Sequence, residues 1–184
     1  MLADHLTIGM KLYGLRQYLM VSPDATAGAY RVVNEMGMRY IQFSAERVLG
    51  RSNIIMLPYR PGQINATRMK GEEVISGEFT GCIMTTFNND GVRMCAHVCT
   101  QQGYTRRQDW NEIKGSGVYS DVIERDTLGM VANFVGATMN TSVLCVAEPA
   151  NGQIRHVYVE RAQEQEFRNG GMVTEQVYRV VQVG

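Results

Sequence analysis

Two tight-turn sequences, each between runs of strand-forming residues, most constrain how this chain can fold. They are Asn88-Asn89-Asp90-Gly91 and Pro149-Ala150-Asn151-Gly152. Asp-Gly and Asn-Gly favour short hairpin turns, whose backbone twist matches the twist of the flanking strands. The sequence therefore predicts two antiparallel hairpins, with strands over 82–87 and 92–100 in the first and over 141–147 and 154–160 in the second.

Other segments predict further strands and two helices. Ser22-Pro23-Asp24 has a capping residue, a proline at the first helical position and an acid in the first turn, and Gly37 is a typical helix end. A helix over 23–36 is therefore predicted, and a second helix from Ser120, with Gly129 as a weakening residue. Further strands are predicted over 39–43, 53–57, 73–76 and 172–181. Together these elements predict an α+β fold, an antiparallel β-sandwich core with flanking helices.

Length and charge limit the class of protein. The 184 residues suit a single domain, 1–184, because a chain of ~150 residues already buries roughly 70% of its unfolded surface. Eighteen basic and eighteen acidic side chains give a formal net charge of +0. This balance lacks the basic footprint of a general nucleic-acid binder, so no nucleic-acid partner is expected. No membrane span is expected either, since no apolar run approaches ~20 residues.

The first residues do not resemble a secretory signal. Asp4, His5, Lys11 and Arg16 interrupt the apolar residues there. We therefore expect either a cytoplasmic protein or one that is secreted or translocated into a target cell without a cleavable signal peptide. The spacing of the four cysteines is unlike a disulfide framework and indicates reduced thiols.

The first hairpin brings a thiol and an imidazole together. If residues 88–91 form a four-residue loop, Cys82 lies directly opposite His97. If Asp90-Gly91 is a two-residue turn, Cys82 lies opposite Cys99, and His97 is its diagonal neighbour on the same face. Both registers place Cys82 and His97 within reach of each other.

A Cys–His pair is the minimum equipment for nucleophilic thiol catalysis, because the imidazole accepts the thiol proton and later protonates the leaving group. Gly81 permits a close backbone approach just before Cys82, and the N–H groups there can form an oxyanion site. Such a thiol should lie in a shallow cleft. The alternative is structural, with Cys82 a small buried apolar residue and His97 a hydrogen-bonded sheet histidine.

A zinc site is the other possibility on this strand. Cys95, His97 and Cys99 alternate along it like a ligand set. However, residues four apart on a continuous strand are ~13 Å apart, so the two thiolates cannot both reach one metal at ~2.3 Å. We therefore expect no metal.

The stretch Ser76-Gly77-Glu78-Phe79-Thr80-Gly81-Cys82, followed by His97, resembles the active-site segment of bacterial protein-glutamine deamidases. This group includes the cytotoxic necrotizing factor catalytic domain, the Burkholderia lethal factor and the chemoreceptor glutamine deamidase. In the group a Gly/Ser-Cys opens a strand and a histidine follows on a neighbouring strand, here fifteen residues later. Some members add a threonine six residues before the cysteine, where this chain has Ser76. Others use a backbone carbonyl instead. The resemblance covers residues 73–100.

This resemblance implies a cysteine-dependent protein-glutamine deamidase of the bacterial effector-toxin type. It implies Cys82 as nucleophile, His97 as acid and base, Ser76 as the group that orients His97, Gly81 at the oxyanion site, and no cofactor. The partner would be a glutamine-containing target protein, which the sequence does not identify. Alternatives are another thiol enzyme, such as a cysteine peptidase, acyltransferase or transglutaminase, and a non-catalytic β-sandwich interaction domain.

Overall fold

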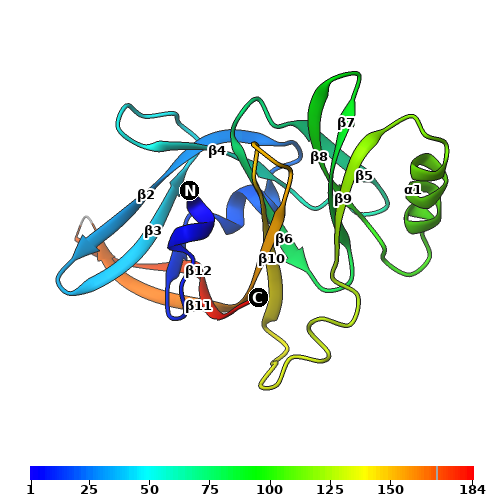
Figure 1. Ribbon diagram of the computed structural model, residues 1–184. Helices are drawn as coiled ribbons and strands as arrows, with labels where there is room; N and C mark the ends of the chain where they lie inside the picture. The colour runs from blue at the N-terminus through cyan, green and yellow to red at the C-terminus, as the bar shows by residue number, and fades with distance from the viewer. Residues whose placement is uncertain (169) are drawn as a thin grey trace.

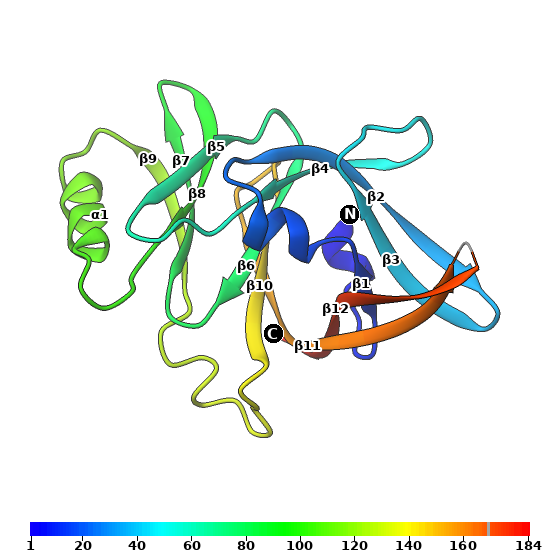
Figure 2. The same cartoon turned by 180° about the vertical axis from the view of Figure 1, so that it is seen from behind.

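A closed β-barrel and a smaller sheet beside it make up the fold (Figures 1 and 2). The computed structural model describes residues 1–168 and 170–184. Around the barrel the strands follow the order β1 (Lys11–Tyr13), β12 (Gly171–Val183), β11 (Ile154–Arg168), β10 (Thr141–Ala147), β6 (Glu73–Phe79), β4 (Ser52–Leu57), β2 (Thr26–Glu35) and β3 (Met38–Ser44). The second sheet has the order β5 (Ile64–Arg68), β8 (Val92–Val98), β7 (Ile83–Asn89) and β9 (Ser120–Asp126).

Three short helices accompany the sheets: η1 (Leu2–His5), η2 (Gln17–Val21) and α1 (Arg106–Gly115). The chain start and η1 lie within the curve of the barrel strands (Figures 1 and 2), where Leu2 and Leu6 join the barrel core. Glu73 of β6 accepts a hydrogen bond from the Leu2 N–H at 2.7 Å, which fixes the chain start to the barrel wall. None of the helices in the described residues is long and apolar enough to cross a membrane.

The central strands β7 and β8 of the second sheet are buried on both faces over most of their length. Alternate residues of β7 and β8 point to opposite sides, as the period of a strand requires. Cys82, Met84 and Cys95 pack against barrel residues such as Leu57 and Phe79. The opposite face, with Ile83, Phe87, Ala96 and Val98, packs on Trp110 of α1. The sheet therefore forms a middle layer between the barrel wall and α1 (Figure 1).

The structure confirms both predicted hairpins. β7 and β8 pair from Asn89↔Val92 to Ile83↔Val98, and β10 and β11 pair from Ala147↔Ile154. The further predicted strands over 39–43, 53–57, 73–76 and 172–181 lie within β3, β4, β6 and β12. The β-rich character is therefore confirmed, whereas the predicted β-sandwich core is wrong, since the main sheet closes into a barrel.

Both predicted helices are wrong. The segment over 23–36 contains strand β2, which pairs with β3 on one side and β4 on the other. Gly37 ends β2 through a tight turn to β3, with φ of 49° at Met36 and 75° at Gly37. The helix from Ser120 is also absent, because residues 120–126 pair with β7 as β9. A glycine at positive φ suits a helix end and a hairpin turn equally, so Gly37 could not distinguish them.

Candidate active site

The hairpin of β7 and β8 has the two-residue turn. Asp90 and Gly91 both have positive φ, 48° and 79°, and Met84 lies opposite His97. Continuing this register past Ile83↔Val98 places Cys82 opposite Cys99, with His97 diagonal to Cys82 on the face toward the barrel. Diagonal neighbours are ~7–8 Å apart, within reach of longer side chains.

The His97 ring lies in an aromatic setting at the boundary between sheet and barrel. Its side chain is 1% exposed. The ring stacks on Phe79, with centroids 4.1 Å apart, and lies 5.4 Å from the ring of Tyr59. Burial lowers the pKa of His97 from 6.5 to about 3, so the free protein holds a neutral imidazole at neutral pH.

A short hydrogen-bond chain fixes the tautomer of His97. The Ser76 hydroxyl donates to the Leu57 carbonyl oxygen at 2.7 Å, and Ser76 Oγ lies 2.9 Å from His97 Nδ1. Because a hydroxyl has one proton and the carbonyl takes it, Nδ1 must carry a hydrogen and donate it to Ser76. The other nitrogen, Nε2, is then a lone-pair acceptor. It is buried and has no hydrogen-bond partner among the described residues.

Ser76 reaches His97 because β6 belongs to the barrel wall that faces the second sheet. Ser76 pairs with Leu57 of β4 and with Cys145 of β10. The register of β6 against β10 shifts between Val143 and Cys145, an irregularity of the kind that redirects side chains. The short connection 80–82 then leads from the barrel into β7. Ser76 therefore reaches His97 from the barrel sheet, whereas no hydrogen bond joins Cys82 to His97 among the described residues.

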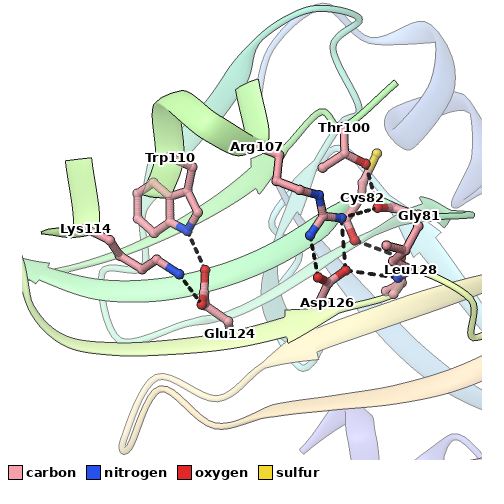
Figure 3. Close-up of polar contacts among 10 residues, drawn as sticks. Gly81, Cys82, Thr100, Arg107, Trp110, Lys114, Glu124, Asp126 and Leu128 are labelled. Atoms are coloured by element: carbon pink, nitrogen blue, oxygen red, sulfur yellow. Dashed lines mark hydrogen bonds and ion pairs between the residues drawn. The ribbon is translucent and has the colours of Figure 1, made fainter. Parts of the chain in front are cut away.

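Hydrogen bonds hold the backbone around Cys82 on both sides (Figure 3). The Gly81 carbonyl accepts from Thr100 Oγ1 at 2.5 Å and from Arg107 Nη2 at 3.0 Å. The Cys82 carbonyl accepts from Thr127, from its N–H at 3.1 Å and from its hydroxyl at 2.7 Å. Arg107 is held in turn by an ion pair with Asp126. These contacts position the two peptide groups beside the sulfur.

The Cys82 thiol is nearly buried, with 9% of the residue exposed. Burial raises its pKa, while the N–H and hydroxyl of Thr100 and the charge of Arg107 oppose that rise. At neutral pH Cys82 is therefore a thiol that needs a base. The expected shallow cleft is not open at this position, and Leu128 lies next to Gly81 with 68% of its own surface exposed.

Cys95, His97 and Cys99, the residues that alternate like a zinc ligand set, have separate environments. The Cys95 thiol is completely buried near Cys145, and burial raises its pKa strongly. His97 directs Nδ1 to Ser76, and Cys99 accepts a hydrogen bond from the Gly62 N–H at 3.2 Å.

Sequence reasoning missed Thr100, Arg107 and Tyr59. Thr100 and Arg107 contact the Cys82 backbone, and Tyr59 lies against His97. None of them belongs to a motif. Thr100 directly follows Cys99 on the predicted strand. The register that pairs Cys82 with Cys99 therefore brings the Thr100 hydroxyl near Gly81, and this was the one signal in the sequence for any of the three residues.

No family model and no curated protein sequence match this chain. Among solved structures, the C-terminal domain of CNFy from Yersinia pseudotuberculosis is similar over 86% of this chain and 73% of that domain, with 13% sequence identity and a TM-score of 0.37.

Proposed function

We propose that residues 1–184 form one catalytic domain, a cysteine-dependent protein-glutamine deamidase with Cys82 as nucleophile. The observation that supports this most is the chain Leu57–Ser76–His97, which leaves Nε2 of a neutral, buried imidazole as a free acceptor on the Cys82 face. A histidine with only a structural role in the core would be expected to satisfy both ring nitrogens. The resemblance of residues 76–82 to the deamidase segment agrees with this assignment.

The first half of the reaction forms a thioester. His97 Nε2 takes the Cys82 thiol proton, and the thiolate attacks the carboxamide carbon of a substrate glutamine. The imidazolium then gives its proton to the departing nitrogen, which leaves as ammonia. Ser76 stabilises the imidazolium by accepting from Nδ1, as the third member of a triad does.

The second half regenerates the enzyme. His97 removes a proton from water, which attacks the thioester carbon, and the returning proton restores the Cys82 thiol as glutamate leaves. No metal or organic cofactor takes part.

The oxyanion of both intermediates needs donors beside the sulfur. Gly81 O is held by Thr100 and Arg107, and the N–H of Cys82 belongs to the same planar peptide group. In a trans peptide this N–H points away from those two donors, so it stays available to the substrate. Gly81 thus contributes through its backbone.

The partner in this proposal is a folded protein that presents a glutamine. Because Cys82 is 9% exposed, the glutamine must displace a neighbouring side chain to reach the thiol, and we propose Leu128, an exposed side chain beside Gly81, as the one that moves. We further propose that the protein acts as an effector toxin that enters the cytosol of a target cell.

The test is to incubate the protein with bacterial and eukaryotic lysates in water enriched in oxygen-18 and to map new glutamates by peptide mass spectrometry. We expect a glutamine site that gains one heavy oxygen with wild type and none with Cys82→Ser. Cys95→Ala is the matched control, since Cys95 is a buried thiol of the same hairpin. Cleaved peptide bonds would instead indicate a peptidase, and glutamines joined to amines a transglutaminase.

A further inference from the structure

Two of the four cysteines, Cys82 and Cys99, lie at the open end of the first hairpin. Cys82 precedes β7 by one residue and Cys99 follows β8 by one residue, so the register places them directly opposite each other. The proposed reaction uses Cys82 alone and gives Cys99 no role.

The backbone hydrogen bonds show which kind of pair this is. The Cys99 N–H donates to Gln63 O at 3.1 Å, on the side of β5. The Cys82 carbonyl accepts from Thr127, on the side of β9. Both backbones therefore point away from each other, which makes Cys82 and Cys99 a non-hydrogen-bonded antiparallel pair. In such pairs the Cα atoms are ~4.5 Å apart and the side chains are closest.

That separation falls within the range that a disulfide requires, Cα atoms ~4.4–6.8 Å apart. The other two thiols contrast with this. Cys95 of β8 and Cys145 of β10 belong to packed sheets, which lie ~10 Å apart, so a bond between them would need backbone movement.

The surroundings of Cys99 favour the thiolate. Its sulfur accepts from the Gly62 N–H at 3.2 Å, while the Tyr59 hydroxyl, 3.4 Å from the sulfur, donates its proton to Gln101 Oε1 at 2.8 Å. Burial raises the pKa of Cys99, but the hydrogen bonds at the sulfur, with the N–H groups of Gln101, Gly62 and Gln63 as donors, outweigh it and leave that pKa below its ordinary value. A thiolate next to a second thiol is the arrangement that converts oxidation into a disulfide.

We propose that Cys82 and Cys99 are a reversible oxidation site, in which a disulfide between them blocks the nucleophile. With hydrogen peroxide as oxidant, both S–H bonds break and one S–S bond forms. The O–O bond of the peroxide breaks, and its two oxygens take up the two thiol protons and two electrons and leave as two water molecules. A dithiol reductant reverses the step. The blocking role rests on the proposed function of Cys82, whereas the formation of the bond does not.

The experiment treats the full-length protein with hydrogen peroxide and measures its intact mass, followed by alkylation and peptide mapping. We expect the intact mass to fall by two hydrogens and the peptides of Cys82 and Cys99 to be joined by a disulfide. Cys95 and Cys145 should still be alkylated after unfolding. Dithiothreitol should restore the original mass. In Cys82→Ala, Cys99 should instead proceed to the sulfinic acid, while Cys145→Ala should form the disulfide as wild type does.

A link between other cysteines, or Cys99 oxidised to the sulfinic acid equally fast in wild type and Cys82→Ala, would overturn the proposal. The wild-type mass alone decides whether the bond forms if Cys82→Ala does not fold. This mass measurement needs no substrate. If the disulfide forms in a protein that converts no glutamine to glutamate, the oxidation site is supported and only the deamidase proposal is contradicted.

Discussion

At the scale of single residues, Ser76 has a role that its position in the sequence only suggested. It accepts a hydrogen bond from His97 Nδ1 and donates one to the Leu57 carbonyl oxygen. The carbonyl reaches the imidazole through the serine hydroxyl.

Removing that hydroxyl should impair the imidazole without removing the nucleophile. Ser76→Ala leaves Nδ1–H of His97 without an acceptor in a fully buried position. We expect the free energy of unfolding to fall by about 1–3 kcal/mol and kcat to fall less than in Cys82→Ala. Urea denaturation and the rate of glutamate formation measure the two effects. Unchanged kcat in a stable Ser76→Ala protein would show that Ser76 does not orient His97.

His97 should also make stability depend on pH. Its pKa falls from 6.5 to about 3 on burial, so between these values the unfolded chain binds the proton and the folded chain does not. Stability should therefore decrease as pH falls below 6.5, by at most about 1.4 kcal/mol per pH unit from this group. Urea denaturation between pH 4.5 and 7.5 tests this, and His97→Gln should show a shallower slope. An identical slope in both proteins would contradict the buried neutral imidazole.

At the scale of elements, helix α1 contacts the backbone next to Cys82 through the side chain of Arg107. Arg107 donates to Gly81 O and forms an ion pair with Asp126, while Lys114 of the same helix pairs with Glu124 farther along β9 (Figure 3). Both cations are partly exposed, but only Arg107 contacts the backbone beside Cys82.

Arg107→Ala should make the Cys82 thiol less acidic, since the charge of Arg107 lowers that pKa. We expect the pH profile of Cys82 alkylation by iodoacetamide to move to higher pH, with peptide mapping to separate Cys82 from the other thiols. Lys114→Ala is the control of equal charge change on the same helix and should leave the profile unchanged. If both variants behave alike, the effect comes from net charge and not from contact with Gly81.

The hairpin turn carries the register that brings the site together. Gly91 has a φ of 79° and open space around the position of a Cβ, so Gly91→Ala introduces backbone strain alone. We expect a loss of about 1 kcal/mol in unfolding free energy, measured by urea denaturation. Gly115→Ala, at the end of α1 without positive φ, should be neutral or stabilising. Equal losses in both variants would contradict the turn geometry.

Turn chemistry was the most reliable sequence signal, and helix signals were the least. Asp90-Gly91 fixed one hairpin because few residues tolerate two successive positive φ values. The segment after Ser22 carried a good helix start, yet it forms β2, where hydrogen bonds to two neighbouring strands outweigh local preference. The structure explains the glycine at position 28 of β2, since a Cβ there would lie 2.2 Å from the Ser44 carbonyl oxygen of β3.

At the scale of the whole molecule, barrel closure and the assembly of the site depend on contacts between distant segments. The barrel closes through β1, a strand of three residues that pairs with β3 and β12. A strand this short has no periodic pattern to detect, so a sandwich was the simpler expectation. Thr100 and Arg107 likewise reach Gly81 only through the packing of the second sheet with α1. The register that puts Cys82 and His97 on the same face of the sheet, by contrast, follows from one local hairpin.

We propose that Cys82 and His97 act as one catalytic unit. The most direct measurement is the rate of glutamate formation, on the target site mapped in lysate, by wild type, Cys82→Ala, His97→Ala and the double variant, each checked for folding by circular dichroism. The account predicts that both single variants lose activity and that the double variant is no worse than either, because a unit fails once any member is removed. A well-folded Cys82→Ala protein with full activity would contradict it.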